Sequence, residues 1–185
     1  MAKRVFLVHG WGGSPETDFF IWLKNELGNR GFSVEAPAMP DTETPVIEKW
    51  VPALEKAVGE PDSDTYFIGH SIGCQTIIRY MEKANQRAGG ALFIAGWFYL
   101  KGMEEAEESI ARPWTENPIN CNKVKENLGK ISVLLSDDDP YDCLDENVRA
   151  FKDELGADVT VKRNMGHFND PKYEFILDEF MKLIK

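Results

Sequence analysis

Ser71 lies in the sequence Gly69-His70-Ser71-Ile72-Gly73, between a short apolar stretch and an amphipathic one. The β-branched and aromatic residues of 65–68 indicate a buried strand, and the three- and four-residue spacing of apolar residues after Ser71 predicts a helix. A serine with glycine two positions before and after it, at a strand-to-helix junction, fits a sharp turn that exposes a nucleophilic hydroxyl. The positive end of the helix would lie behind that hydroxyl. The alternative is an ordinary turn before a helix, because a five-residue match also arises by chance.

A serine hydroxyl is a weak nucleophile at neutral pH and needs a base within hydrogen-bond reach. Histidine has a suitable pKa for this task, and the chain contains His9, His70 and His167. His9 ends the first predicted strand, where we expect a buried, hydrogen-bonded structural role. His70 is adjacent to Ser71, and the geometry of the turn should point it away from the hydroxyl. We therefore expect His167 to be the base, and the alternative is a loop histidine without a catalytic role.

Three aspartates, Asp137, Asp138 and Asp139, directly follow the fifth predicted strand. A carboxylate that orients the histidine and stabilises its protonated form would complete the site. An acidic run after a strand is also commonly solvated or caps a helix, so this run has a structural interpretation as well. Ser71, the acidic run and His167 follow the third, fifth and sixth predicted strands, in the chain order Ser, Asp, His.

The elements that must position these residues alternate regularly along the chain. Continuous apolar runs, which are typical of strands buried on both faces of a parallel sheet, alternate with amphipathic helical patterns. This alternation predicts a doubly wound α/β fold with a mostly parallel six-stranded sheet and helices on both faces. Gly89 and Gly90 are expected to end the helix that follows Ser71. Because ligands bind outside the carboxyl ends of the strands in such sheets, the candidate residues should meet there. The apolar runs comprise residues 5–8, 32–36, 65–68, 91–95, 131–135 and 159–161.

Length and composition narrow the class of protein. No break in composition divides the 185 residues, which indicates a single domain over residues 1–185. The formal net charge of −10 argues against a nucleic-acid or membrane partner, since both favour clustered Lys and Arg. The three cysteines lack the spacing of a disulfide framework or a zinc site, and Cys74 is expected to be a small buried residue. Without a signal-peptide pattern or a membrane-spanning stretch, a cytoplasmic location is expected.

The pattern changes at about residues 97–120, between the fourth and fifth predicted strands. Aromatic residues, prolines and an acidic patch predict a short lid-like insertion that is part helix and part loop. We expect Trp97, Phe98 and Trp114 to form the apolar wall of a substrate pocket. The alternative is a satellite hydrophobic cluster under a long loop.

Over essentially its whole length, the chain resembles the α/β-hydrolases, and in particular the small family without a large cap that includes retinoblastoma-binding protein 9 and the YdeN-like hydrolases. This resemblance implies Ser71 as the nucleophile, His167 as the base and an aspartate of the acidic run as the third member. The position directly before Pro140 favours Asp139, with Asp138 as the alternative. The matching stretches are Val8–Gly13, Gly69–Gly73, Ser136–Pro140 and Gly166–Phe168.

The resemblance also implies that the backbone N–H groups of Trp11 and Ile72 bind the oxyanion. The expected reaction is cleavage of an ester, thioester or amide of a small substrate through an acyl-enzyme on Ser71, as in a carboxylesterase. This reaction calls for no metal or organic cofactor, and the expected partner is a small-molecule acyl substrate. Nothing in the sequence indicates a protein partner. Two alternatives stay open: a non-catalytic protein-interaction module on a hydrolase fold, and an acyltransferase.

Overall fold

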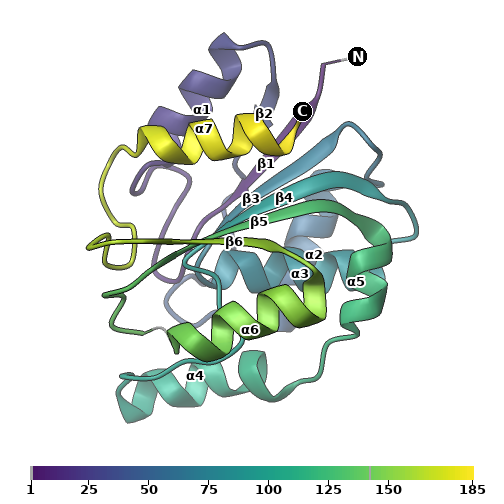
Figure 1. Ribbon diagram of the computed structural model, residues 1–185. Helices are drawn as coiled ribbons and strands as arrows, with labels where there is room; N and C mark the ends of the chain where they lie inside the picture. Colours follow the sequence, from purple (N-terminus) through teal and green to yellow (C-terminus); the bar gives the residue numbers. More distant parts are fainter. Residues whose placement is uncertain (1, 142) are drawn as a thin grey trace.

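The computed structural model describes residues 2–141 and 143–185, which form a six-stranded sheet between two layers of helices (Figure 1). The alternation of strands and helices confirms the predicted α/β fold. The strands are β1 (Arg4–Val8), β2 (Ser33–Glu35), β3 (Thr65–His70), β4 (Ala88–Ile94), β5 (Leu128–Ser136) and β6 (Asp158–Lys162). The helices are α1 (Phe20–Asn29), α2 (Ile47–Val58), α3 (Ile72–Lys83), α4 (Glu105–Glu116), α5 (Cys121–Asn127), α6 (Leu144–Leu155) and α7 (Glu174–Leu183).

The strands pair in parallel throughout the sheet, in the order β2-β1-β3-β4-β5-β6. The order reverses at β1, because the chain passes from β1 to β2 on one side and then returns to β3 on the other. Such a reversal opens a crevice at the carboxyl ends of the two central strands. Val8 pairs with Gly69 across β1 and β3, so the loops that follow these two strands start side by side.

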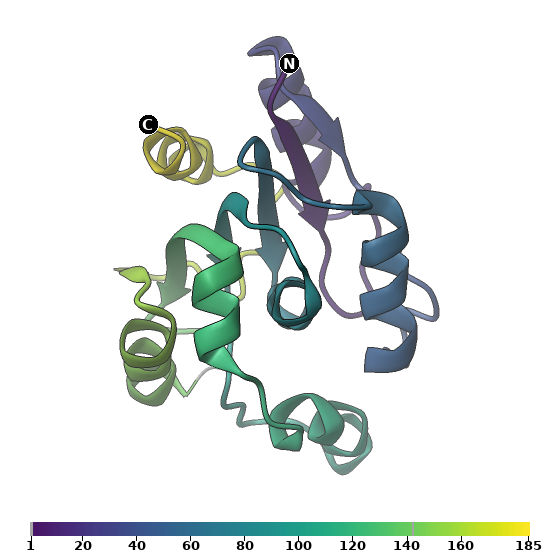
Figure 2. The ribbon, with the colours of Figure 1, turned by 90° about the vertical axis from the view of Figure 1, so that its right-hand side faces the viewer.

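The two faces of the sheet bury separate hydrophobic clusters. Helices α1 and α7 cover one face, and α2, α3, α5 and α6 cover the other, as Figures 1 and 2 show from two directions. Successive residues of β1 enter opposite clusters, with Phe6 and Val8 on the α2 and α3 side and Val5 and Leu7 on the α1 and α7 side. Burial on both faces explains why the strands are continuous apolar runs in the sequence. None of the helices that the structure describes is long and apolar enough to cross a membrane.

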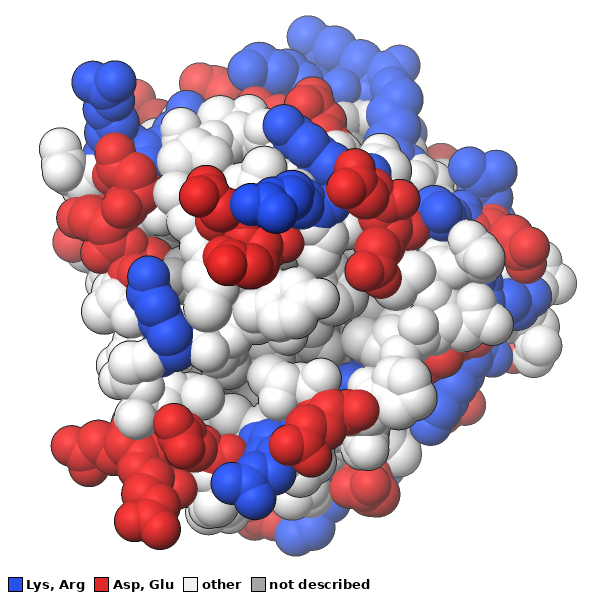
Figure 3. Space-filling model, turned by 60° about the horizontal axis from the view of Figure 1, so that its bottom comes forward, with Lys and Arg blue, Asp and Glu red and all other residues white. Residues whose placement is uncertain are grey.

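Helix α4 lies outside these two layers, at the bottom of the views in Figures 1 and 2. It belongs to the 97–120 segment, which therefore consists of a helix with flanking loops, as expected. On the face shown in Figure 3, acidic and basic side chains are intermingled around an uncharged central area.

The region between α3 and β4 differs from the prediction. Helix α3 ends at Lys83, and Gly89 and Gly90 lie inside β4 instead of ending the helix. Close packing accounts for both glycines: a Cβ on Gly89 would lie 2.5 Å from Cζ of Tyr66, and a Cβ on Gly90 would lie 2.5 Å from the carbonyl oxygen of Lys130. Glycine marks the close approach of another group within a strand as well as the end of a helix, and sequence alone does not separate the two.

Candidate active site

Ser71 occupies the tight turn between β3 and α3, with φ 53° and ψ −123°. A serine in this region of backbone conformation is strained, and the surrounding packing must hold it there. A Cβ on Gly73 would lie 2.2 Å from the carbonyl oxygen of Val8, and a Cβ on Gly69 would lie 2.8 Å from Cδ1 of Ile77. Both glycines of the motif are therefore required, because α3 packs directly against the ends of β1 and β3.

His167 and Asp139 form a hydrogen-bonded pair on the loops after β6 and β5. The distance between His167 Nδ1 and Asp139 Oδ2 is 2.7 Å. A carboxylate accepts hydrogen bonds, so Nδ1 carries the proton and Nε2 is left as the basic nitrogen. The other Asp139 oxygen accepts from the backbone N–H of Tyr141 at 3.0 Å, and the Tyr141 ring lies edge-on to the imidazole. The carboxylate and the imidazole are thus both fixed in orientation.

The other two aspartates of the acidic run have different partners. Asp138 Oδ1 accepts from the hydroxyl of Ser136 at 2.6 Å and from the backbone N–H of Gly166 at 2.8 Å. These hydrogen bonds lower the pKa of the Asp138 carboxyl, and the one from Ser136 is the largest cause. Asp137 Oδ1 accepts from the backbone N–H of Asn164 at 2.9 Å. Asp137 and Asp138 therefore tie the loop after β5 to the loop that carries His167, and Asp139 is the member of the run that hydrogen-bonds to the imidazole.

His9 is buried, and both of its ring nitrogens have partners. Nδ1 lies 2.9 Å from the carbonyl oxygen of Gly10, and Nε2 accepts from the backbone N–H of Met39 at 3.0 Å. Burial lowers the pKa of this histidine. Its hydrogen bonds connect the loop after β1 to the segment after β2, which agrees with the structural role expected for it.

His70 is also buried, but it contacts the candidate base. Its Nε2 lies 2.7 Å from the carbonyl oxygen of His167 and donates to it, since a carbonyl oxygen only accepts. The two imidazole rings pack with centroids 5.1 Å apart. Its Nδ1 lies 3.8 Å from Asp18 Oδ2. The adjacency to Ser71 gave no sign of this contact with a loop 97 residues further along the chain.

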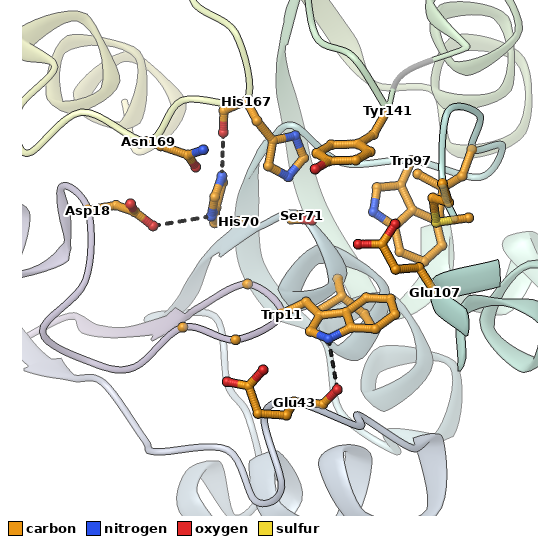
Figure 4. A pocket seen from close by; sticks show the side chains of 16 residues that line it. Trp11, Asp18, Glu43, His70, Ser71, Trp97, Glu107, Tyr141, His167 and Asn169 are labelled. Carbon is orange, nitrogen blue, oxygen red and sulfur yellow. Dashed lines mark hydrogen bonds and ion pairs between the residues drawn. The ribbon is translucent and has the colours of Figure 1, made fainter. Parts of the chain in front are cut away.

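Ser71 and His167 line the same cavity, which has a volume of about 380 Å³ and lies at the carboxyl ends of β1 and β3 (Figure 4). The figure shows a ring nitrogen of His167 directed toward Ser71. Trp11 and Ile72 line the cavity as well. Across the described residues, the backbone N–H groups of Trp11 and Ile72 have no hydrogen-bond acceptor, so both are available to a bound group.

One of the three residues expected to form an aromatic wall lines the cavity. Trp97 lines the cavity, together with Leu100 and Met103 from the same segment. Phe98 and Trp114 are not among the described lining residues, and their expected place there was wrong. Each has its own packing partner, as Phe98 packs on another ring of the core and the Trp114 indole is buried.

Trp114 anchors α4 to the rest of the molecule. Its indole N–H donates to the carbonyl oxygen of Pro45 at 3.0 Å, and its ring lies edge-on to Trp50.

Cys74, in the first turn of α3, is completely buried, and its sulfur lies 3.6 Å from the carbonyl oxygen of Ile94. Burial raises the pKa of this thiol, which agrees with the role of a small buried residue.

The topology and the site together define a class of protein. In this chain, the third strand of a doubly wound parallel sheet leads through a strained serine into a helix, and a hydrogen-bonded histidine and aspartate lie on later loops. This is the architecture of the α/β-hydrolases. The sequence model of the family described as "Serine hydrolase" matches residues 5–174. The chain belongs to this family of hydrolases.

Similar proteins agree with this assignment. The YdeN protein of Bacillus subtilis (strain 168) is 27% identical over 141 residues, which cover 75% of this chain and 72% of YdeN. The crystal structure of the ydeN gene product matches with a TM-score of 0.87 at 22% identity, over 98% of both chains. The serine hydrolase RBBP9 of Rattus norvegicus is 27% identical over 180 residues, which cover 96% of this chain and 86% of RBBP9. The resemblance inferred from the sequence is confirmed.

Proposed function

We propose that this protein cleaves an ester, thioester or amide of a small substrate through an acyl-enzyme on Ser71. The observation that carries this proposal is the 2.7 Å hydrogen bond between His167 Nδ1 and Asp139. It leaves the basic Nε2 of an imidazole in the same cavity as a serine on a strained turn. A serine, a base and a group that orients the base are the parts that nucleophilic acyl transfer needs.

The reaction proceeds in two similar halves. Ser71 Oγ attacks the carbonyl carbon while His167 Nε2 takes the hydroxyl proton, and Asp139 stabilises the imidazolium that forms. The tetrahedral intermediate collapses when His167 donates that proton to the leaving group, and the acyl group stays on Ser71. Water then attacks the acyl-enzyme with His167 again as the base, which releases the acid and regenerates the serine.

The backbone N–H groups of Trp11 and Ile72 would stabilise the oxyanion of the tetrahedral intermediate. Both residues line the cavity that Ser71 lines. The loop of Trp11 is held in place by two hydrogen bonds, from the Trp11 indole to the carbonyl oxygen of Glu43 and from the backbone N–H of Gly12 to that of Thr42. Such a preorganised donor contributes about 3–4 kcal/mol to transition-state stabilisation.

The cavity favours small or medium acyl groups. Its volume of about 380 Å³ is at the lower end of the range for small-molecule sites. Trp97, Leu100 and Met103 close it on the side of the 97–120 segment, which acts as a short lid over the site. Long acyl chains would require these side chains to move.

A fluorophosphonate probe tests the proposal, because it reacts quickly only with a serine that a base activates. We expect stoichiometric labelling of the wild-type protein at Ser71 and none in Ser71→Ala. Ser109→Ala, which removes an exposed hydroxyl on α4, is the control and should label normally. A folded protein that does not label would favour the alternative of a non-catalytic interaction module. Product analysis with water and with an added alcohol as competing acceptors separates hydrolysis from acyl transfer.

A further inference from the structure

Three carboxylate side chains line the cavity around Ser71, and they come from three separate parts of the chain. Asp18 lies between β1 and α1, Glu43 lies between β2 and α2, and Glu107 lies in the first turn of α4. The described residues that line the cavity include no lysine or arginine to balance them. The cavity is therefore a region of negative potential, which favours positive charge in a bound molecule.

Glu107 is the carboxylate placed best to contact a substrate. Figure 4 shows it between the indoles of Trp11 and Trp97, and all three side chains line the same cavity. Glu107 is half-buried, whereas Glu105 in the same helical turn is exposed. The Glu107 side chain also accepts a hydrogen bond from the backbone N–H of Glu104 at 2.9 Å, so its carboxylate is held in position before a ligand arrives.

A second observation lies on the opposite side of Ser71. Because His70 donates from Nε2 to the carbonyl oxygen of His167, its Nδ1 is unprotonated and accepts hydrogen bonds. This nitrogen is buried, has no hydrogen-bond partner in the described part of the chain, and faces Asp18 Oδ2 at 3.8 Å. Two acceptors therefore meet beside the cavity, and the described part of the chain places no donor between them.

We propose that the cavity selects substrates that carry an organic ammonium group, with Glu107 as its ionic partner and the indoles of Trp11 and Trp97 as its packing surfaces. A carboxylate attracts the cation, and aromatic faces attract it through their quadrupoles. A quaternary or alkylated ammonium suits this arrangement, because its apolar groups pack on the indoles while its charge needs no hydrogen bond. This inference rests on the proposed function, since it names the class of ester that Ser71 would attack.

Glu107 has a structural role that the test must separate from recognition. Glu104 and Glu107 form a capping box at the start of α4. Glutamine also serves at this position of a capping box, so Glu107→Gln keeps the cap and removes the charge. Glu105→Gln is the matched control, because it removes one negative charge from the same turn at a position outside the described cavity lining.

The experiment compares kcat/KM for butyrylcholine with kcat/KM for 3,3-dimethylbutyl butyrate, its neutral isostere. We expect the wild-type protein to prefer the cationic ester, and Glu107→Gln to reduce that preference about five- to tenfold. Glu105→Gln, which lies outside the described cavity lining, should cleave both esters as the wild type does. Equal rates for the two esters in the wild type, or an unchanged preference in Glu107→Gln, would overturn the proposal.

A binding measurement keeps this proposal separate from the catalytic one. Choline and 3,3-dimethyl-1-butanol are titrated into Ser71→Ala, with NMR shift changes of the tryptophan indole signals as the readout. Choline should bind more tightly than the neutral alcohol, and Glu107→Gln in the same background should remove the difference. If choline shows this preference but no ester is cleaved and the fluorophosphonate does not label, the catalytic proposal fails while the cation site stands. If esters are cleaved but choline has no advantage, the cation site is wrong.

Discussion

The Nε2 nitrogen of His70 donates a 2.7 Å hydrogen bond to the backbone carbonyl of His167, so the residue before the candidate nucleophile holds the loop of the candidate base. This link joins the end of β3 to the loop after β6. It fixes the position of His167 relative to Ser71 independently of the Asp139 hydrogen bond. We therefore regard His70 as a positioning residue that acts through His167.

Replacing His70 should misplace the base. His70→Phe keeps the ring packing but loses the donor, and a displacement of about 1 Å in a catalytic group can lower the rate on the order of 10²-fold. His70→Gln, whose amide can reach the same carbonyl, should retain most of the activity. Steady-state kinetics on a p-nitrophenyl ester should place the loss in kcat rather than in KM. Equal activity of His70→Phe and the wild type would show that the hydrogen bond has no positioning role.

His70 also makes stability depend on pH. Burial lowers its pKa from 6.5 to about 3, so the folded protein keeps it neutral while the unfolded chain takes up a proton below pH 6.5. Its contribution to stability is complete above pH 6.5 and is lost progressively as the pH falls toward 3, at up to about 1.4 kcal/mol per pH unit. His9 shifts in the same direction. Urea unfolding across about pH 4 to 7 should therefore show a shallower pH dependence for His70→Gln than for the wild type. Parallel curves for the two proteins would contradict this account.

Substitutions of Asp138 and Asp139 should have different effects on kcat. Asp139→Asn would favour the wrong imidazole tautomer, which lowers kcat by about 10⁴ in a comparable triad. Asp138→Asn keeps a side-chain oxygen that can accept from Ser136 and Gly166 and leaves the imidazole partner in place, so it should have a much smaller effect on kcat. Measured kcat values for both variants, with circular dichroism to confirm folding, decide the assignment. A larger loss in Asp138→Asn would move the acid by one residue.

Gly73, two positions after Ser71, should tolerate no side chain. In Gly73→Ala the added Cβ would lie 2.2 Å from the carbonyl oxygen of Val8, and α3 would have to move away from β1. We expect a loss of roughly 3 kcal/mol or more in the free energy of unfolding. Gly28→Ala, in α1 where a Cβ meets no atom within 4 Å, is the control and should stabilise the protein by up to about 1 kcal/mol. Denaturant unfolding of the two variants measures both, and a mild effect of Gly73→Ala would show that the turn is less constrained than its contacts indicate.

The two tryptophans of the 97–120 segment should separate substrate selection from stability. Trp97→Ala opens the cavity wall, so p-nitrophenyl esters with longer acyl chains should gain in kcat/KM relative to shorter ones. Trp114→Ala removes a buried indole that bonds to Pro45 and should destabilise the protein by about 3–5 kcal/mol with an unchanged chain-length profile. A profile that shifts in Trp114→Ala, or one that stays the same in Trp97→Ala, would contradict the assignment of the wall.

The sequence was sufficient for the parts of the site that depend on local pattern. Glycine is needed on both sides of Ser71 for a steric reason that applies to any chain with such a turn. The continuous apolar runs that alternate with helical patterns follow from burial of the strands on both faces. Contacts between distant segments were not predictable. Trp97 and Trp114 are both tryptophans of the 97–120 segment, and the sequence does not distinguish their roles. Only the fold places Trp97 at the cavity and Trp114 against Pro45. The hydrogen-bond partner of His70 was not predictable either, because it depends on where the loop after β6 lies in the fold.

The proposed mechanism requires an acyl-enzyme at Ser71, and trapping that intermediate tests the mechanism most directly. The protein is mixed with p-nitrophenyl butyrate, quenched in acid during turnover and examined by intact mass spectrometry with peptide mapping. We predict the added mass of one butyryl group, located on Ser71 and absent in Ser71→Ala. Hydrolysis of the ester without any adduct, or with the adduct on another residue, would contradict the proposed mechanism.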